Sequence, residues 1–220
     1  MAKKSAFLLL MCFTLGGCAF GRTHDYLLSH PTLQYSSKER LAVGVQDLRP
    51  YILKHDKEEN FVGLQRGGYG NPFDVRTASG LPLAEDMTKV LTSALAQAGD
   101  VVTSIKISPT MGRAEIIRLF QTNSADKAIL LSLYEWKADT AARTRAIYNI
   151  EMEALDSKGD VLARKRVRGT DNLGGSFWSL DPQSNAQTAV LVAFQKKLEE
   201  LFEGDIAAAL NEQSKGAGFR

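Results

Sequence analysis

A long stretch of alternating residues near the middle of the chain constrains the fold most. Between Arg143 and Leu155, every second residue from Ala146 to Ala154 is apolar, and polar or charged residues hold most positions between them. This period predicts a strand with one buried face. The next segment, Asp156–Asp160, has the composition of a turn, after which residues 161–167 return as a pairing strand. The sequence therefore predicts a long β-hairpin.

Further strands and helices follow from the same kind of pattern. Alternating or continuous apolar residues predict strands, whereas apolar residues at every third or fourth position predict helices. The clearest helix is Leu83–Ala98, because Pro82 precedes it and Gly99 follows its end. The other predicted elements are strands at Leu41–Leu48, Val101–Ile107 and Ala128–Trp136, and helices at Thr110–Phe120 and Ala186–Leu210, the last broken near Gly204 and Asp205.

The predicted elements follow the order β-α-β-α-β-β-β-α. Ala128–Trp136 is apolar on both faces, as expected of a central strand that is covered on two sides. These features predict an α/β (α+β) fold with a single mixed β-sheet flanked by helices. One domain is expected over residues 41–212, followed by a frayed tail at 213–220.

The first residues have the pattern of an export signal. Two lysines at positions 3 and 4 precede the apolar run Ala6–Thr14, and two glycines follow it. A helix needs roughly 20 apolar residues to cross a bilayer, so this run is too short to span one. It is also a poor buried helix, because it begins directly behind two lysines. Residues 1–17 are therefore predicted to be a lipoprotein signal peptide.

The signal ends in a sequence that resembles the bacterial lipobox. Leu15-Gly16-Gly17-Cys18 has the leucine, the two small residues and the cysteine of that motif. The resemblance implies diacylglycerol on the Cys18 sulfur, cleavage between Gly17 and Cys18, and a stable lipid anchor in the membrane. In lipoproteins of this kind, a residue other than Asp after the cysteine usually means transfer to the outer membrane. Here that residue is Ala19, so the resemblance implies an outer-membrane location. Residues 18–40 are expected to be the lipidated cysteine and a short tether that keeps a periplasmic domain near its membrane.

The charge and cysteine content exclude several classes of function. The chain has 27 basic and 25 acidic residues, and removal of the two signal lysines leaves 25 of each. A neutral domain argues against nucleic acid as a partner, because phosphate binding needs a positive excess. Cys12 leaves with the signal and Cys18 is consumed by lipid, so no thiol remains for a disulfide, a metal site or a nucleophile.

Several segments together resemble known groups of envelope lipoproteins. The start, from VQDLRP through FVGLQRGGYGNPFDVRT, is similar to the YajG-like lipoproteins. The hairpin EMEALDSKGDVLARKRV and the helix Thr110–Phe120 resemble the CsgG/LpoB type, although the tether is shorter than that of LpoB. The resemblance implies a non-catalytic binding or assembly module, and it carries over no site residues.

The segment Lys54–Gly80 is too long for a plain connector and has two interpretations. Its glycines permit unusual backbone angles, and loops of this length are usually functional or disordered. One hypothesis is a partner-binding loop, because aromatic residues and arginine are enriched at binding hot spots. The alternative is an extra edge strand at Phe61–Gln65 whose aromatics plug the sheet. The residues concerned are Phe61, Arg66, Tyr69 and Phe73.

Two other segments also have alternative interpretations. Arg164-Lys165-Arg166 with Arg168 would suit an anionic headgroup, or would form the solvated face of an edge strand. Phe177 and Trp178 would form a contact patch or a membrane-interface anchor, or would cap the end of the sheet.

The sequence contains no arrangement that indicates catalysis or metal binding. His24, His30 and His55 are its only histidines, and none has the spacing of metal ligands or of a catalytic triad. We therefore expect a protein that is no enzyme and needs no cofactor or metal. The leading prediction is an outer-membrane lipoprotein that binds an envelope protein as an accessory or assembly factor. The alternatives are a carrier or sensor of lipid or glycan and, less favoured, an envelope hydrolase, for which a nucleophile–base signature is lacking.

Overall fold

Strand β6 (Lys127–Thr140) organises the sheet. Along one side it pairs in parallel first with β2 (Arg40–Asp47) and then with β3 (Phe61–Arg66). Along its other side it pairs antiparallel with β7 (Thr144–Asp156). Two shorter strands therefore follow one another beside a single long one, with the chain between them leaving the sheet and returning.

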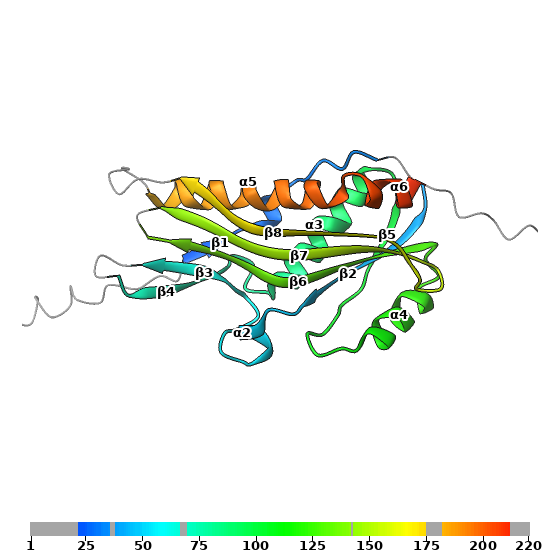
Figure 1. The fold of residues 1–220 in the computed structure, drawn as a ribbon, viewed down its shortest axis with the longest axis horizontal. Helices are drawn as coiled ribbons and strands as arrows, with labels where there is room; N and C mark the ends of the chain where they lie inside the picture. The colour runs from blue at the N-terminus through cyan, green and yellow to red at the C-terminus, as the bar shows by residue number, and fades with distance from the viewer. Residues whose placement is uncertain (1–21, 36–37, 67–69, 142, 175–181, 212–220) are drawn as a thin grey trace, which may run out of the picture.

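The remaining strands extend this arrangement into one mixed, curled sheet of eight strands (Figure 1). The computed structural model describes residues 22–35, 38–66, 70–141, 143–174 and 182–211, with the side chains of 182–185 left out. Next to β2 lies β5, next to β3 lies β4, which also pairs with β1, and next to β7 lies β8. Their bounds are Arg22–His24 for β1, Pro72–Thr77 for β4, Val101–Ser104 for β5 and Val161–Gly174 for β8.

Helices cover the two faces of the sheet unequally. The larger core lies under α3 (Leu83–Gln97), α5 (Pro182–Phe202) and α6 (Asp205–Asn211), which share one face. A smaller core lies on the opposite face under α4 (Arg113–Thr122), whose Ile116 and Phe120 are buried. Among the described residues, the rest of that second face has only the short helix α2 (Pro50–Leu53) beside it (Figure 1).

The predicted fold class is confirmed, and each predicted strand and helix is present. The long hairpin forms β7 and β8, and the chain breaks between α5 and α6 next to Gly204, as expected. The strand expected at Val101–Ile107 ends at Ser104, because Ile105 and Ile107 turn into the smaller core. The prediction did not include β1, α2 or β4, and it gave β3 only as one of two interpretations of its segment.

The tether expected over residues 18–40 is wrong for most of its length. Arg22–His24 form β1 within the sheet, and residues 26–28 form the short 3-10 helix η2. Tyr26 is fully buried, and its hydroxyl accepts a hydrogen bond from Nε1 of Trp136 at 3.0 Å. The folded domain therefore begins by residue 22, because these apolar and aromatic side chains complete the core.

Candidate functional site

The segment Lys54–Gly80 contributes two strands, β3 and β4, to the sheet. Phe61 begins β3 and is only 3% exposed, so it is a core residue and no partner contact. β3 pairs with both β4 and β6. The extra-strand interpretation of Phe61–Gln65 is therefore correct, although the strand lies inside the sheet and not at its edge.

Two of the residues predicted to contact a partner are exposed at the end of the β3–β4 hairpin. Phe73 is 48% exposed at the start of β4. Arg66 is exposed at the end of β3, where its Nε and Nη2 donate to the Asp139 carboxylate, each at 3.1 Å. These hydrogen bonds hold the pKa of Asp139 below its ordinary value, against burial, which raises it. Tyr69, Phe177, Trp178 and the cleavage residues Gly17 and Cys18 lie outside the described residues.

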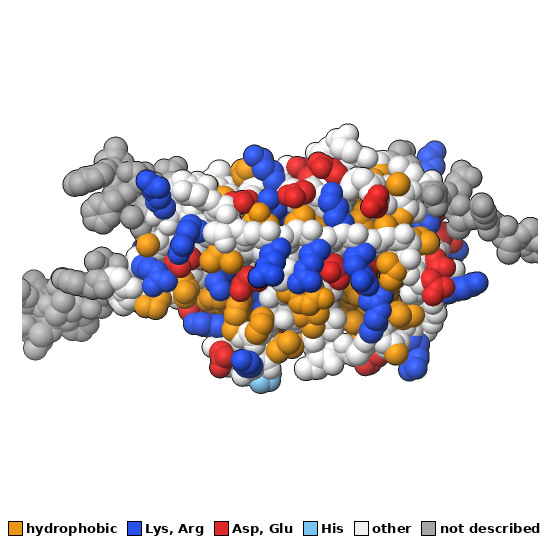
Figure 2. Space-filling view, in the orientation of Figure 1, with side chains coloured by type: hydrophobic (Ala, Val, Ile, Leu, Met, Phe, Trp, Pro, Cys, Tyr) orange, Lys and Arg blue, Asp and Glu red, His pale blue; other side chains and the backbone are white. Residues whose placement is uncertain are grey.

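The clearest surface for interaction is the part of the sheet that the large helices leave uncovered. We call this surface, formed by the outward side chains of β6, β7 and β8, the open face. Figure 2 shows a row of Lys and Arg side chains crossing it beside hydrophobic ones. The alternating exposure of β8, from Leu162 to Asn172, places Arg164, Arg166 and Arg168 there.

Charges on the open face are paired across strands. Glu153 of β7 accepts from Nε of Arg164 at 2.8 Å and from Nη1 of Arg113 at 2.5 Å. Burial raises the pKa of Glu153, but the two arginines outweigh that effect and lower it. The basic strand is therefore a partly neutralised edge strand, which agrees with its interpretation as a solvated face.

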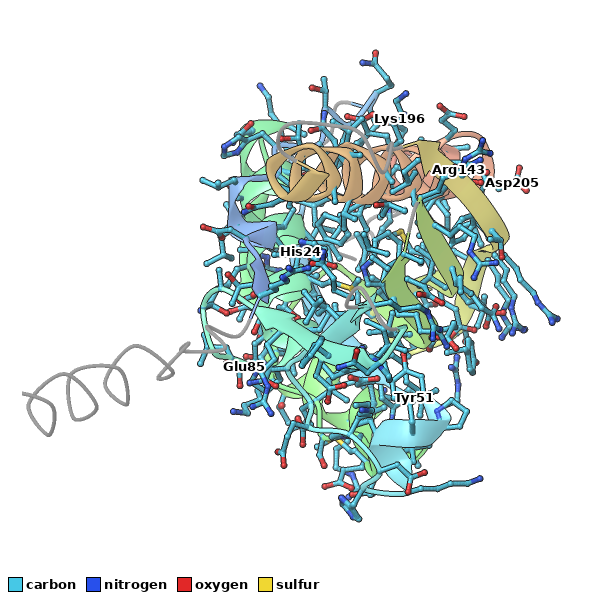
Figure 3. All side chains as sticks on the ribbon, turned by 90° about the vertical axis from the view of Figure 1, so that its left-hand side faces the viewer. His24, Tyr51, Glu85, Arg143, Lys196 and Asp205 are labelled. Carbon is cyan, nitrogen blue, oxygen red and sulfur yellow. The ribbon has the colours of Figure 1, made fainter. Side chains whose placement is uncertain are left out.

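Two tyrosines lie among these charges. The guanidinium of Arg166 lies 4.6 Å from the centre of the Tyr134 ring, within the range of cation–π attraction. The hydroxyl of Tyr51 in α2 donates to Glu135 at 2.7 Å, and the Lys137 ammonium lies 5.4 Å from the ring of Tyr51. In Figure 3, Tyr51 lies in the lower half of the molecule, to the right of Glu85. Tyrosine and arginine are the residue types enriched at protein interfaces.

A crevice lies on another side, where β2 and β5 end. The segment after β5 turns toward the smaller core with Ile105 and Ile107, whereas α3, which follows β4, begins in the larger core on the opposite face. Residues of both segments line the crevice. Its volume is about 220 Å³, and an ion pair between Lys106 and Glu85 crosses its lining. Its apolar walls include Val45, Pro82, Ala84, Ile105 and Ile107.

Two buried polar side chains lie in the larger core and not at either surface. His24 falls in the segment expected to be a tether, but it is buried, and among the described residues neither ring nitrogen has a hydrogen-bond partner. Burial lowers the pKa of His24 to about 4. Asp86 accepts a hydrogen bond from Ser79 at 2.8 Å, and burial raises its pKa.

The described residues contain neither a metal site nor a membrane-spanning helix. In that part of the chain, no group of His, Cys, Asp and Glu side chains has an arrangement that would hold a metal ion. None of its helices combines the length and the apolar character that a bilayer crossing requires.

Comparison with known proteins gives a likeness in fold alone. No family model and no curated protein matches the sequence. Protein XCC0632 from Xanthomonas campestris, a DUF330 protein, has 14% identity and a TM-score of 0.53, over 89% of this chain and 100% of that one. This match shows that the two chains share a fold.

Two weaker matches are lipoprotein GNA1162 from Neisseria meningitidis and the LpoB C-terminal domain from Salmonella enterica. GNA1162 has 13% identity over 74% of this chain and 99% of that one. The LpoB domain has 10% identity over 64% of this chain and 87% of that one. Both TM-scores are 0.29, which is too low to support an argument. The resemblance to YajG-like lipoproteins stays a prediction.

Proposed function

We propose that this protein is an outer-membrane lipoprotein whose periplasmic domain binds a protein partner. It acts as a non-catalytic accessory or assembly factor of a cell-envelope complex. The sequence supports the location, because Cys18 completes a lipobox behind an export signal and Ala19 follows it. The open face supports the mode of action.

The observation that carries partner binding is the unequal covering of the sheet. One face is buried under α3, α5 and α6. Among the described residues, the open face presents Tyr134 and Arg166, with Tyr51 of α2 next to it and only α2 and α4 at its margins. Its rigid strands hold these side chains in place, so little conformational entropy is lost when a partner binds. Its cross-strand ion pairs present both signs of charge, which suits a protein surface of matching pattern.

Crosslinking in intact cells tests this proposal. A photoreactive amino acid replaces Tyr134 on the open face and, as a control, Lys196, which points outward from α5 on another side of the molecule (Figure 3). We expect one discrete protein to be captured from position 134 and not from position 196. Equal capture at the two positions, or capture of no protein, contradicts the proposal.

The crevice favours a second candidate function, a carrier or sensor of lipid or glycan. Its walls offer apolar contacts, and its Lys106–Glu85 pair offers polar contacts, to a small part of a lipid or glycan. Its volume of about 220 Å³ is smaller than the range of roughly 300–1,000 Å³ common for ligand pockets. Extraction of the purified protein followed by mass spectrometry tests this candidate: a lipid or glycan recovered from the wild type and lost in Ala84→Trp supports it.

A further inference from the structure

The cysteine proposed to carry the lipid lies close to the folded domain. Only residues 19–21 separate Cys18 from Arg22, the first residue of β1. A segment of this length spans at most about 14 Å, even when fully extended. If Cys18 carries acyl chains, Arg22 lies within about that distance of the bilayer surface.

The direction of β1 determines which end of the domain is near the bilayer. β1 runs parallel to β4, with Arg22 beside Val75 and His24 beside Thr77. The backbone of β1 therefore enters the sheet from the side where β4 begins, at Pro72 and Phe73. The anchor and Phe73 belong to the same end of the molecule.

Several strand ends meet at this end of the sheet, which we call the Phe73 end. The register places Phe73 beside Gln65, Gln65 beside Thr140, and Thr140 beside Thr144. Thr144 lies beside Gly174, the last residue of β8. At the left of Figure 1, β3, β6 and β8 end where β4 and β7 begin. The end is therefore a broad edge that crosses five strands.

The side chains at the Phe73 end combine an exposed aromatic ring with positive charge. Phe73 is 48% exposed. Arg66, Arg143 and Arg145 are exposed at the same end of the sheet, and one carboxylate, that of Asp139, pairs with both Arg66 and Arg145. Figure 3 looks onto this end, with Arg143 labelled. Bilayers with anionic lipids attract such basic residues, and their interface accepts apolar side chains.

We infer that the Phe73 end rests on the bilayer that holds the anchor. Phe73 enters the boundary between headgroups and acyl chains, and the arginines contact lipid phosphates. This inference depends on the proposed lipidation of Cys18 and adds an orientation to it. The long axes of β6, β7 and β8 then point away from the membrane. The β7–β8 turn lies roughly 45 Å from it, given a rise of about 3.3 Å per residue along β7.

Quenching by labelled lipid tests the orientation. The full-length, lipidated protein is reconstituted into vesicles of phosphatidylethanolamine and phosphatidylglycerol that contain a nitroxide-labelled lipid. An environment-sensitive fluorophore is attached to Phe73→Cys or, as a matched control, to Leu162→Cys. Both side chains are apolar, lie on strands and are similarly exposed, at 48% and 44%, but Leu162 lies at the far end of β8.

The two possible failures give different results. We expect the fluorophore at position 73 to be quenched several-fold more than the one at position 162, with a blue-shifted emission. Equal quenching at both positions, in protein that floats with the vesicles, overturns the orientation and leaves the anchor intact. Protein that does not float with the vesicles contradicts the anchor, and the orientation with it.

Discussion

Arg49 and Asp47 form a buried ion pair in which Nε and Nη2 of the arginine donate to the two carboxylate oxygens at 2.8 and 2.6 Å. The same guanidinium also donates to backbone carbonyl oxygens of Glu59 at 3.1 Å and of Trp136 at 3.3 Å. The Arg49 side chain therefore occupies the gap beside β6 between the end of β2 and the start of β3. One side chain satisfies the polar groups that this interruption of the sheet leaves unpaired.

The first prediction concerns this ion pair. Arg49→Met leaves the Asp47 carboxylate buried without its partner, and it removes the donors to the nearby carbonyl groups. We expect the free energy of unfolding to fall by about 3–5 kcal/mol, the usual cost of breaking a buried pair. Urea denaturation measures the change. Arg40→Met is the matched control, because it removes a solvent-exposed pair with Asp126. Similar losses in the two variants would contradict a special role for Arg49.

The second prediction concerns the close approach of β3 to β6. A Cβ atom added at Gly63 would lie 2.3 Å from the carbonyl oxygen of Ala138, a backbone atom that cannot move aside. Gly63→Ala must therefore push the β3–β4 hairpin away from β6. Overpacking of this kind lowers the free energy of unfolding by about 1–3 kcal/mol. We expect to measure it as a lower melting temperature.

Gly112→Ala provides the control for this substitution. Gly112 precedes α4, and nothing lies within 4 Å of the place where its Cβ would be. Because Gly112 is the N-cap of α4 and alanine is a poorer N-cap, we expect a loss of stability, but a smaller one than that of Gly63→Ala. A Gly63→Ala protein that melts at the wild-type temperature would show that β3 is not held against β6 as described.

These two sites show why the sequence predicts some elements and not others. The hairpin of β7 and β8 and the helix α3 depend on patterns within one segment, so their periodicity is visible in the chain. Arg49 acts through carbonyl groups of Glu59, Phe61 and Trp136, which are brought together only by the fold. β3 is short and interrupted by Gly63, so its sequence allowed a strand but did not decide between a strand and a loop.

The same reasoning applies to the candidate surfaces. The sequence identified the arginines of β8 and the exposed Phe73, because residue type alone marks them as surface candidates. It did not identify Tyr134 or Tyr51, since neither stands out until β6, β8 and α2 lie together. It placed Phe61 at a partner contact because the residue shares a segment with glycines, whereas its ring is buried, with Tyr51 and Lys57 packed against it.

The third prediction concerns pH and His24. Burial lowers the pKa of this histidine to about 4, whereas an unfolded histidine titrates near 6.5. Between these values the unfolded chain binds a proton that the folded chain does not. Stability is therefore greatest above pH 6.5 and falls as the pH drops to about 4, by roughly 3 kcal/mol in total.

Urea midpoints measured at pH 7 and pH 5 test this dependence. We expect His24→Leu to remove most of the difference between the two midpoints, because leucine fills the apolar site without a titrating group. His55→Asn, which replaces an exposed histidine, is the control and should keep the difference. If His24→Leu retains the full pH dependence, the loss of stability in acid arises from other groups.

The last prediction separates the two cysteines. Cys18→Ser should abolish incorporation of labelled palmitate and release the domain from the membrane fraction, because only the thiol forms the thioether. Cys12→Ser replaces the same type of residue a few positions earlier, within the apolar run of the signal, and should change neither result. Ala19→Asp should keep the label but shift the protein from the outer to the inner membrane on a sucrose gradient. Equal labelling of Cys18→Ser and wild type would remove the anchor, and with it the reason for placing the Phe73 end on a bilayer.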